Sequence, residues 1–472
     1  MKKDSFSTKL YRTSENASLS DLRTGERGRR VVRISEEYLT KIIAEVRKKL
    51  TDGMSSAAEK LILNTLENYS HTPENKAKLY QLLSHTLETL GRYKEGLEVI
   101  EKYDDEELLD ELDLEHRILV VTQLSVALNN NNEQPKAVAL LNYALEEAEA
   151  ENLKQFYGEI YIALARVYRK LNECPIARDY AEKALNSYRA EGDWHGMANA
   201  YHMIATSYNQ EGNSEKSLEY FQQAIKIIGE RTAHFLLGKI YSDMSGAYWF
   251  LRRPQDGIAY LEKSIKFFEK TEHKVQSVAA YNNLGINLMM LGDWAKAEIV
   301  IKKALDIALE VNHVHIAGIL DSLGELKLLR GEFEEAQELL EQGVAIAEKH
   351  KKEWYAIQAM RNLARCLLAQ GKIAEAKEEA QETIKICRKI GETRVANMAN
   401  LVLSEVYLEE NAIAECENQL QLIEETDPNS DFFVLGNIQR IRGLLALKNN
   451  SLAPVPRLSS ANGTGMDCDP PS

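Results

Sequence analysis

The stretch that decides the fold is residues 277–312, SVAAYNNLGINLMMLGDWAKAEIVIKKALDIALEVN. Apolar and small residues recur at helical spacing on both sides of Gly292-Asp293, which predicts two amphipathic helices joined by a tight turn. Gly285 in the first helix and Ala297 and Ala304 in the second stand where large side chains would hold the helices apart. A lone helical hairpin cannot bury its apolar faces, so similar hairpins are expected on both sides.

The rest of the chain supplies these neighbours. A large residue followed by a small one recurs in nine pairs at steps of 39 to 41 residues: Leu83-Ser84, Leu124-Ser125, Leu164-Ala165, Ile204-Ala205, Met244-Ser245, Leu284-Gly285, Leu323-Gly324, Leu363-Ala364 and Leu403-Ser404. Such a register predicts an array of helical hairpins. Glycine holds most of the turn positions, and asparagine tolerates the left-handed turn conformation, whereas Arg252 adopts it less readily.

This pattern resembles the tetratricopeptide repeat. The segments MLGDWAKA (290–297) and RGEFEEAQ (330–337) match the turn of that family closely. The step of about 40 residues, rather than 34, is similar to the longer class in kinesin light chains and in helical domains of bacterial transcriptional activators. The resemblance implies an all-α, right-handed superhelical solenoid of about nine to ten antiparallel helix pairs, with residues 437–450 as a capping helix.

Composition divides the chain into three parts. Residues 1–32 are polar and basic and are predicted to be a disordered N-terminal arm, either a solvated tail or an electrostatic docking arm. Residues 33–450 carry the solenoid. Residues 451–472 are rich in Pro, Ser and Gly and are predicted to be a disordered tail. The abrupt change leaves open that the chain is a truncated form of a longer regulator.

Charge and cysteine content restrict the partners and the compartment. A net charge of −14 disfavours direct binding to nucleic acid and repels anionic membranes. Five cysteines without close pairing, and no signal or membrane-spanning segment, indicate a cytoplasmic protein. Either end of a solenoid could pair with a second copy, so the oligomeric state stays open.

The chain shows no motif for catalysis or for a cofactor. A phosphate-binding loop, a dinucleotide fingerprint and a nucleophile elbow are all missing from the sequence. His313 and His315 are interpreted as connector histidines, and Cys366 and Cys387 as packed side chains. We therefore expect no enzyme, metal or cofactor; the enzymatic alternative is a helical phosphatase-like regulator.

Recognition is then the chemistry to look for. In the family, the first helices line the concave face, so the residues two before and two, five and six after each large residue should face the groove. Along the array, that face has three zones. The first zone is basic and polar and contains Arg166, Arg169, Lys170, His202, Thr206, Asn209 and Gln210. The second zone is apolar and contains Trp249, Phe250, Met289, Met290, Leu328, Leu329 and Leu368, and the third is charged and contains Asp321, Glu325, Arg361, Arg365 and Glu405.

Each zone has a structural alternative. The apolar side chains either hold an amphipathic or extended peptide or fill the joints between repeats. The charged residues either pair across repeats, as Asp321 with Arg361, or capture a carboxylate through Arg361 and Arg365. Asn282, Asn283 and Asn362 could fix a peptide main chain, although the series of asparagines is incomplete.

The predicted function is a scaffold or adaptor that binds a protein or peptide in the concave groove. The candidate binding residues are Trp249, Phe250, Asn282, Asn283, Met289, Met290, Leu328, Leu329, Arg361, Asn362 and Arg365. The alternative is the sensory half of a bacterial signalling or transcription regulator whose effector domain is absent from this chain.

Overall fold

The computed structural model describes residues 32–271, 274–310, 315–426 and 432–448. The predicted arm up to residue 31, the predicted tail, His313 and Cys468 lie outside these residues. Val32, the last residue of the predicted arm, starts a short strand.

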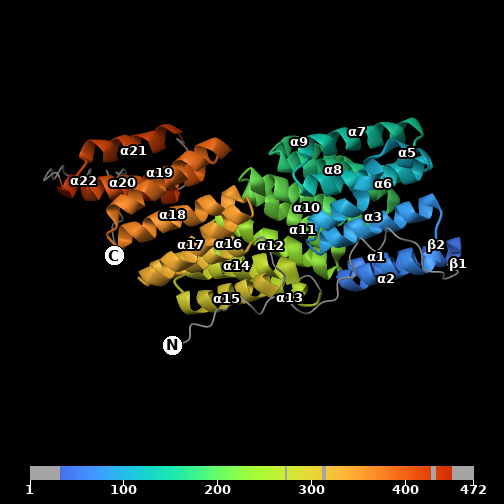
Figure 1. The fold of residues 1–472 in the computed structure, drawn as a ribbon, viewed down its shortest axis with the longest axis horizontal. Coiled ribbons are helices and arrows are strands. Elements are labelled where there is room, and N and C mark those ends of the chain that lie inside the picture. Colours follow the sequence, from blue (N-terminus) through green and yellow to red (C-terminus); the bar gives the residue numbers. More distant parts are fainter. Residues whose placement is uncertain (1–31, 272–273, 311–314, 427–431, 449–472) are drawn as a thin grey trace, which may run out of the picture.

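Helices make up almost all of the described chain, and they follow one another as antiparallel pairs (Figure 1). The pairs in the first half are α1 (Glu36–Thr51) with α2 (Ser55–Asn68), α3 (Pro73–Thr89) with α4 (Tyr93–Ile100), α6 (Leu114–Asn130) with α7 (Gln134–Ala150), α8 (Tyr157–Lys170) with α9 (Cys174–Glu191), and α10 (Trp194–Gln210) with α11 (Ser214–Ile228).

The second half continues in the same way. Its pairs are α12 (His234–Phe250) with α13 (Pro254–Phe268), α14 (Lys274–Met290) with α15 (Trp294–Glu310), α16 (Ile316–Leu329) with α17 (Phe333–Lys349), α18 (Glu353–Ala369) with α19 (Ile373–Ile390), and α20 (Thr393–Glu409) with α21 (Ile413–Thr426). The last helix, α22 (Phe432–Lys448), packs on α20 and α21 and covers the end of the array, as predicted.

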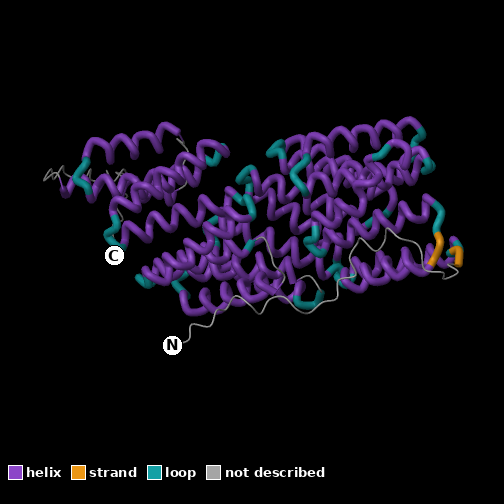
Figure 2. The backbone as a smooth tube through the Cα atoms, viewed as in Figure 1, coloured by secondary structure: helices purple, strands orange, loops and turns teal. Residues whose placement is uncertain are grey.

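Short elements accompany the pairs, among them the 3-10 helices η2 (Glu101–Asp104) and η3 (Lys154–Phe156). A short helix, α5 (Glu106–Asp110), lies between α4 and α6. Two-residue strands β1 (Val32–Arg33) and β2 (Tyr69–Ser70) pair in parallel and tie the start of α1 to the end of α2. They are the orange segments at one end of the array in Figure 2. No alternating run of β-branched residues predicted these strands.

The large–small pairs hold each hairpin together. All nine pairs lie in first helices, and every member is buried. A β-carbon at Gly324 would lie 2.6 Å from Cγ of Leu340 on α17, so only glycine allows the two helices to approach this closely. The solenoid predicted from the register is therefore confirmed.

The turns adopt the conformation that the register requires. Gly292 has a φ of 77°, and Arg252, the least suited residue in the series, has a φ of 57°. Because a non-glycine residue is disfavoured in this region, Arg252 shows that packing of the helices overrides its local preference.

Tyrosines strengthen three consecutive hairpins. Tyr168, Tyr208 and Tyr248 lie four residues after the large residue of their first helix. They stack on Tyr180, Tyr220 and Tyr260 of the second helix, with ring centroids 5.5, 5.5 and 5.1 Å apart. The ring pairs fix the outer edge of the hairpins formed by α8–α13.

Candidate partner-binding groove

In the seven repeats from Leu164-Ala165 to Leu403-Ser404, the sixth residue after the large residue is exposed at the end of the first helix. In α12, α14 and α16 this residue is Phe250, Met290 and Leu329, with exposed fractions of 55, 50 and 43%. The equivalent residues on either side, Gln210 and Ala369, are polar or small and also exposed. Three neighbouring repeats therefore present one large apolar side chain each; we call Phe250, Met290 and Leu329 the apolar stripe.

In α12, α14 and α16, the fifth residue after the large residue is less exposed than the sixth. Met289 is only 7% exposed and belongs to the core formed by α13–α16. Leu328 is half-buried and packs against the core of the next hairpins, and Trp249 is also half-buried. The sixth position after the large residue therefore faces solvent, whereas the fifth position mainly fills the joints between repeats.

The asparagines do not form a regular series. Asn282 is half-buried, and its Oδ1 has no hydrogen-bond partner among the described residues. Asn283 is exposed. Asn362, which is fully buried, donates from Nδ2 to Oδ1 of Asp321 at 2.7 Å. Asn283 and Asn362 therefore have different environments despite equivalent register.

The charged zone is a network between α16 and α18. Arg365 donates through Nη1 to Oε1 of Glu325 at 3.1 Å and to Oδ1 of Asn362 at 3.0 Å. Asp321 accepts its hydrogen bond from Asn362, and the charge of Arg361 acts on Asp321 as well. Burial raises the pKa of Asp321 to about 6.

Glu405 also has a different partner from the one its register suggested. Its Oε1 accepts a hydrogen bond from Nη2 of Arg440 on the capping helix α22. The expectation of charge pairs across repeats is therefore correct for Glu325 with Arg365, whereas Glu405 ties the array to its cap.

Arg361 stands out in this network. It is only 7% exposed, its Nη1 lies 3.3 Å from Sδ of Met398, and its Nε has no hydrogen-bond partner among the described residues. Burial is the main cause that lowers the pKa of its guanidinium, partly offset by the nearby Glu325 and Asp321. A buried cation without a directly bonded carboxylate is costly, which makes Arg361 a candidate for binding an external anion.

The basic and polar zone begins the same face. Lys170 donates through Nζ to the backbone oxygen of Asn129 at 2.6 Å. His202 lies with Nε2 at 2.7 Å from Oδ2 of Asp243 on α12. Asp243 and Lys239 were not among the predicted groove residues, because Asp243 directly precedes Met244 and falls between the assumed positions, whereas Lys239 lies five residues before Met244 and falls outside them.

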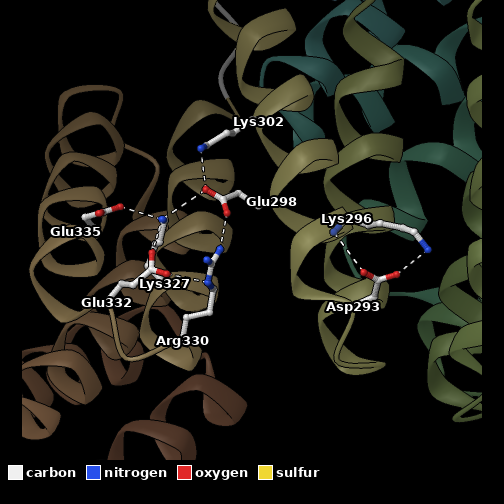
Figure 3. A network of polar contacts seen from close by, with 8 residues as sticks. All are labelled: Asp293, Lys296, Glu298, Lys302, Lys327, Arg330, Glu332 and Glu335. Atoms are coloured by element: carbon white, nitrogen blue, oxygen red, sulfur yellow. Dashed lines mark hydrogen bonds and ion pairs between the residues drawn. The ribbon is translucent and has the colours of Figure 1, made fainter.

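A second charge network joins α15, α16 and α17 (Figure 3). Lys327, with a side chain 10% exposed, forms ion pairs with Glu298 at 3.4 Å and Glu335 at 2.9 Å, and a shorter one with Glu332. Arg330 and Lys302 also pair with Glu298. Every charge in this group has a partner, so the network stabilises the joint and offers no unpaired group to a ligand.

Metal and thiol chemistry have little support in the described part of the chain. Within residues 32–271, 274–310, 315–426 and 432–448, no three His, Cys, Asp or Glu side chains are arranged to hold a metal ion. Cys174, Cys366, Cys387 and Cys416 are free and buried, and burial raises the pKa of each thiol. Such thiols are poor nucleophiles.

Family comparisons agree with this architecture. Models of the tetratricopeptide repeat match residues 77–105, 157–230 and 196–270, and the model of the MalT-like TPR region matches residues 245–462. The chain is therefore a tetratricopeptide-repeat protein. Its C-terminal half is similar to the MalT-like TPR region. Among the described residues, none of the helices combines the length and apolar character needed to cross a bilayer.

Individual relatives are distant. The chain is 21% identical over 224 residues to the human "Tetratricopeptide repeat protein 19, mitochondrial", a match that spans 47% of this chain and 58% of that protein. The apo quorum sensor NprR from B. thuringiensis has 16% identity and a TM-score of 0.53, and covers 74% of this chain and 99% of its own.

A Rap protein complexed with Competence and Sporulation Factor has 15% identity and a TM-score of 0.54, covering 76% of this chain and 99% of its own. At these identities, the solved structures establish a shared fold alone.

Proposed function

We propose that this protein is a scaffold that binds an apolar segment of a partner protein along the apolar stripe. The observation that supports the proposal is the exposure of Phe250, Met290 and Leu329 at one register position in three consecutive repeats. The equivalent neighbours Gln210 and Ala369 are not large apolar residues, so the exposed surface has defined ends.

The spacing of the stripe suits an extended or helical ligand. First helices pack side by side, so one side chain from each helix forms a row across them. A row of apolar side chains on adjacent elements binds the apolar face of an amphipathic segment. Met290 in the middle adds a flexible, polarisable contact that adapts to the ligand.

The charged zone supports a more specific part of the proposal, namely which chemical group of the partner is bound. Arg365 is already engaged by Glu325 and Asn362, whereas Arg361 bonds no carboxylate directly among the residues that the structure describes. We therefore assign a carboxylate of the partner to Arg361, with Arg365 and Asn362 as the groups that hold the surrounding network in place.

The test is a comparison of two triple variants in affinity capture from the native cell. The first, Phe250→Ser, Met290→Ser and Leu329→Ser, removes the stripe. The control, Ile176→Ser, Ile299→Ser and Leu309→Ser, removes three apolar side chains that are also exposed but lie on second helices. Partners that bind the groove should be lost from the first variant and kept by the control. Equal recovery by both variants would exclude the stripe as the binding surface.

A second candidate function is the sensory half of a signalling regulator. It is favoured by the fold shared with NprR, which is named a quorum sensor, and with a Rap protein complexed with a peptide factor. The genomic test is a coding sequence for an effector domain that continues from this chain. Its absence in every frame would count against this candidate.

Two further properties belong to the same proposal. A scaffold needs no catalytic group, so a general hydrolase screen should give no activity above background. We also propose a cytoplasmic location, supported by the four free buried thiols. Because the human relative is named mitochondrial, fractionation of the native cell is the direct measurement.

A further inference from the structure

The capping helix α22 follows the pattern of a first helix, and no second helix comes after it among the described residues. It lies at the end of the array opposite to β1 (Figure 1). The side that packs against α20 and α21 consists of Val434, Ile438, Ile441 and Leu445. Gly443 comes 39 residues after Ser404 and so takes the place of the small residue in a large–small pair. The other side of α22 is therefore the one that further helices cover in an inner repeat.

The register positions that the inner repeats bury are open in α22. Met289 of α14 is 7% exposed, whereas Leu447, which also lies four residues after the small residue, is 66% exposed. A β-carbon at Gly285 would lie 2.1 Å from Ile301, whereas a β-carbon at Gly443 would meet no atom within 4 Å. Within the described part of the chain, this face of α22 is thus left uncovered.

An end helix that serves only as a cap needs a polar outer face. The helix α1 at the other end of the array meets this requirement, because most of its exposed residues are charged or polar: Glu36, Glu37, Thr40, Lys41, Glu45, Arg47 and Lys48. Most exposed residues of α22 are instead apolar or glycine: Leu435, Gly436, Gly443, Leu444, Ala446 and Leu447. Of the two ends, α22 is therefore the one suited to contact another protein surface.

The open face of α22 is complementary to itself. Its central line consists of Gly436, Arg440, Gly443 and Leu447, spaced four, three and four residues apart. If two copies of α22 pair antiparallel about an axis between residues 441 and 442, Leu447 of one copy meets Gly436 of the other, and Arg440 meets Gly443. Each contact places a large side chain on a glycine, so the two helices approach closely without a clash.

The charges also favour this end of the array. A net charge of −14 makes most contacts between two copies repulsive. The sequence of α22 contains no Asp or Glu, and Arg440 on its open face already forms an ion pair with Glu405 of α20. Two copies of α22 therefore meet without bringing unpaired charges into the interface.

The residues that follow α22 are a poorer occupant of this face. The predicted tail contains Pro454 and Pro456, followed by Gly463 and Gly465. Proline and glycine both disfavour a helix, so the sequence of residues 451–472 predicts no second helix that could lie on α22. A helix of a second copy fits the open face better.

We propose that α22 pairs antiparallel with α22 of a second copy of this chain. The helix has 17 residues and is about 25 Å long, so one helix pair covers less than the roughly 800 Å² per partner of a stable complex. The dimer is therefore weak, with a Kd in the micromolar range. The inference goes beyond the proposed function and does not rest on it: a dimer presents two grooves to a partner that carries repeated segments.

Sedimentation equilibrium of the full chain, from about 1 to 200 μM, tests the dimer. The average mass of the wild type should rise with concentration from 53.5 kDa towards twice that value. Leu447→Glu should raise the Kd by about tenfold or more, because it buries a charge at the interface. The matched control is Ile299→Glu on α15, where the side chain is 68% exposed, and it should leave the Kd unchanged. A wild type that stays at 53.5 kDa, or an equal effect of the two variants, would overturn the proposal.

A size swap tests the antiparallel pairing itself. Gly436→Leu should weaken the dimer, because the new side chain meets Leu447 of the other copy. It should leave the fold intact, since a β-carbon at Gly436 meets nothing within 4 Å. Adding Leu447→Ala removes the opposing side chain, so the double variant should return to within about threefold of the wild-type Kd. Urea unfolding checks that each variant is folded. A dimer that the second substitution does not restore would contradict this pairing.

Discussion

Gly285 of α14 lies directly against Ile301 of α15: a β-carbon built on Gly285 would lie 2.1 Å from Cγ1 of Ile301. Ile301 is fully buried, so its side chain has no free space into which it could move. Gly285→Ala should therefore destabilise the protein by about 1–3 kcal/mol through overpacking, as seen in a lower midpoint of urea unfolding.

The cause of that loss can be isolated. In an Ile301→Ala background, Gly285→Ala should lower the free energy of unfolding much less, because the clashing atoms of Ile301 are absent. Gly443→Ala on α22, where a β-carbon meets nothing within 4 Å, should instead raise stability by about 0.5–1 kcal/mol. Equal effects at Gly285 and Gly443 would show that close helix approach is not the reason for glycine at position 285.

The turn before α18 offers a stabilising change. Lys351 is exposed and has a φ of 53°, a conformation that costs a non-glycine residue about 1 kcal/mol. Lys351→Gly should raise the free energy of unfolding by about that amount. Lys349→Gly, two residues earlier at the end of α17, should lower it by about 0.5–1 kcal/mol, because the helical backbone there gains nothing from glycine. Thermal unfolding of both variants checks the opposite signs.

Removal of Lys327 should be among the most damaging changes to the joint between α15, α16 and α17. Lys327→Met leaves Glu298, Glu332 and Glu335 without their shared cation, and a loss of about 3 kcal/mol is expected. Lys302→Met is the control, since that side chain is 59% exposed and its ion pair should contribute less than about 1 kcal/mol. Similar urea midpoints for the two variants would contradict a special role for Lys327.

Stability should also depend on pH through Glu298. The hydrogen bond from Lys302, and then the charge of Lys327, lower the pKa of Glu298 to about 2. The pKa of Glu298 in the folded protein lies below its pKa in the unfolded chain. The ionised carboxylate therefore stabilises the fold fully above about pH 4.5, and this stabilisation is lost as the pH falls towards 2. At pH 7, the free energy of unfolding of the wild type should exceed that of Glu298→Gln by about 2–3 kcal/mol. This difference should shrink between pH 5 and 3. A constant difference across that range would refute the assignment.

Arg361 is expected to lower the stability of the free protein and to provide a binding group for the partner. Its buried guanidinium lacks a bonded carboxylate, so Arg361→Met should be neutral or stabilising by about 1 kcal/mol without a ligand. Arg365→Met removes bonds to Glu325 and Asn362 and should destabilise by about 1–3 kcal/mol. Calorimetric unfolding of the two variants distinguishes them; strong destabilisation by Arg361→Met would show a structural role instead.

The exposed part of the groove was only partly predictable from the register. Phe250, Met290 and Leu329 are exposed, because a helical period of 3.6 residues directs them away from the buried large–small pairs. Met289 is a neighbour in sequence, yet it is buried, because the next repeat covers it. Burial by an adjacent repeat depends on how the helices cross, which no single repeat encodes.

The repeat, the helix pairs and their turns follow from the amino-acid sequence alone. The 40-residue register needs only local rules: small residues where helices touch, and glycine or asparagine where the backbone turns left-handed. Which polar groups meet depends on the packing of neighbouring repeats. Asn362 donates to Asp321, and Arg365 pairs with Glu325, because α16 and α18 lie side by side in the assembled array.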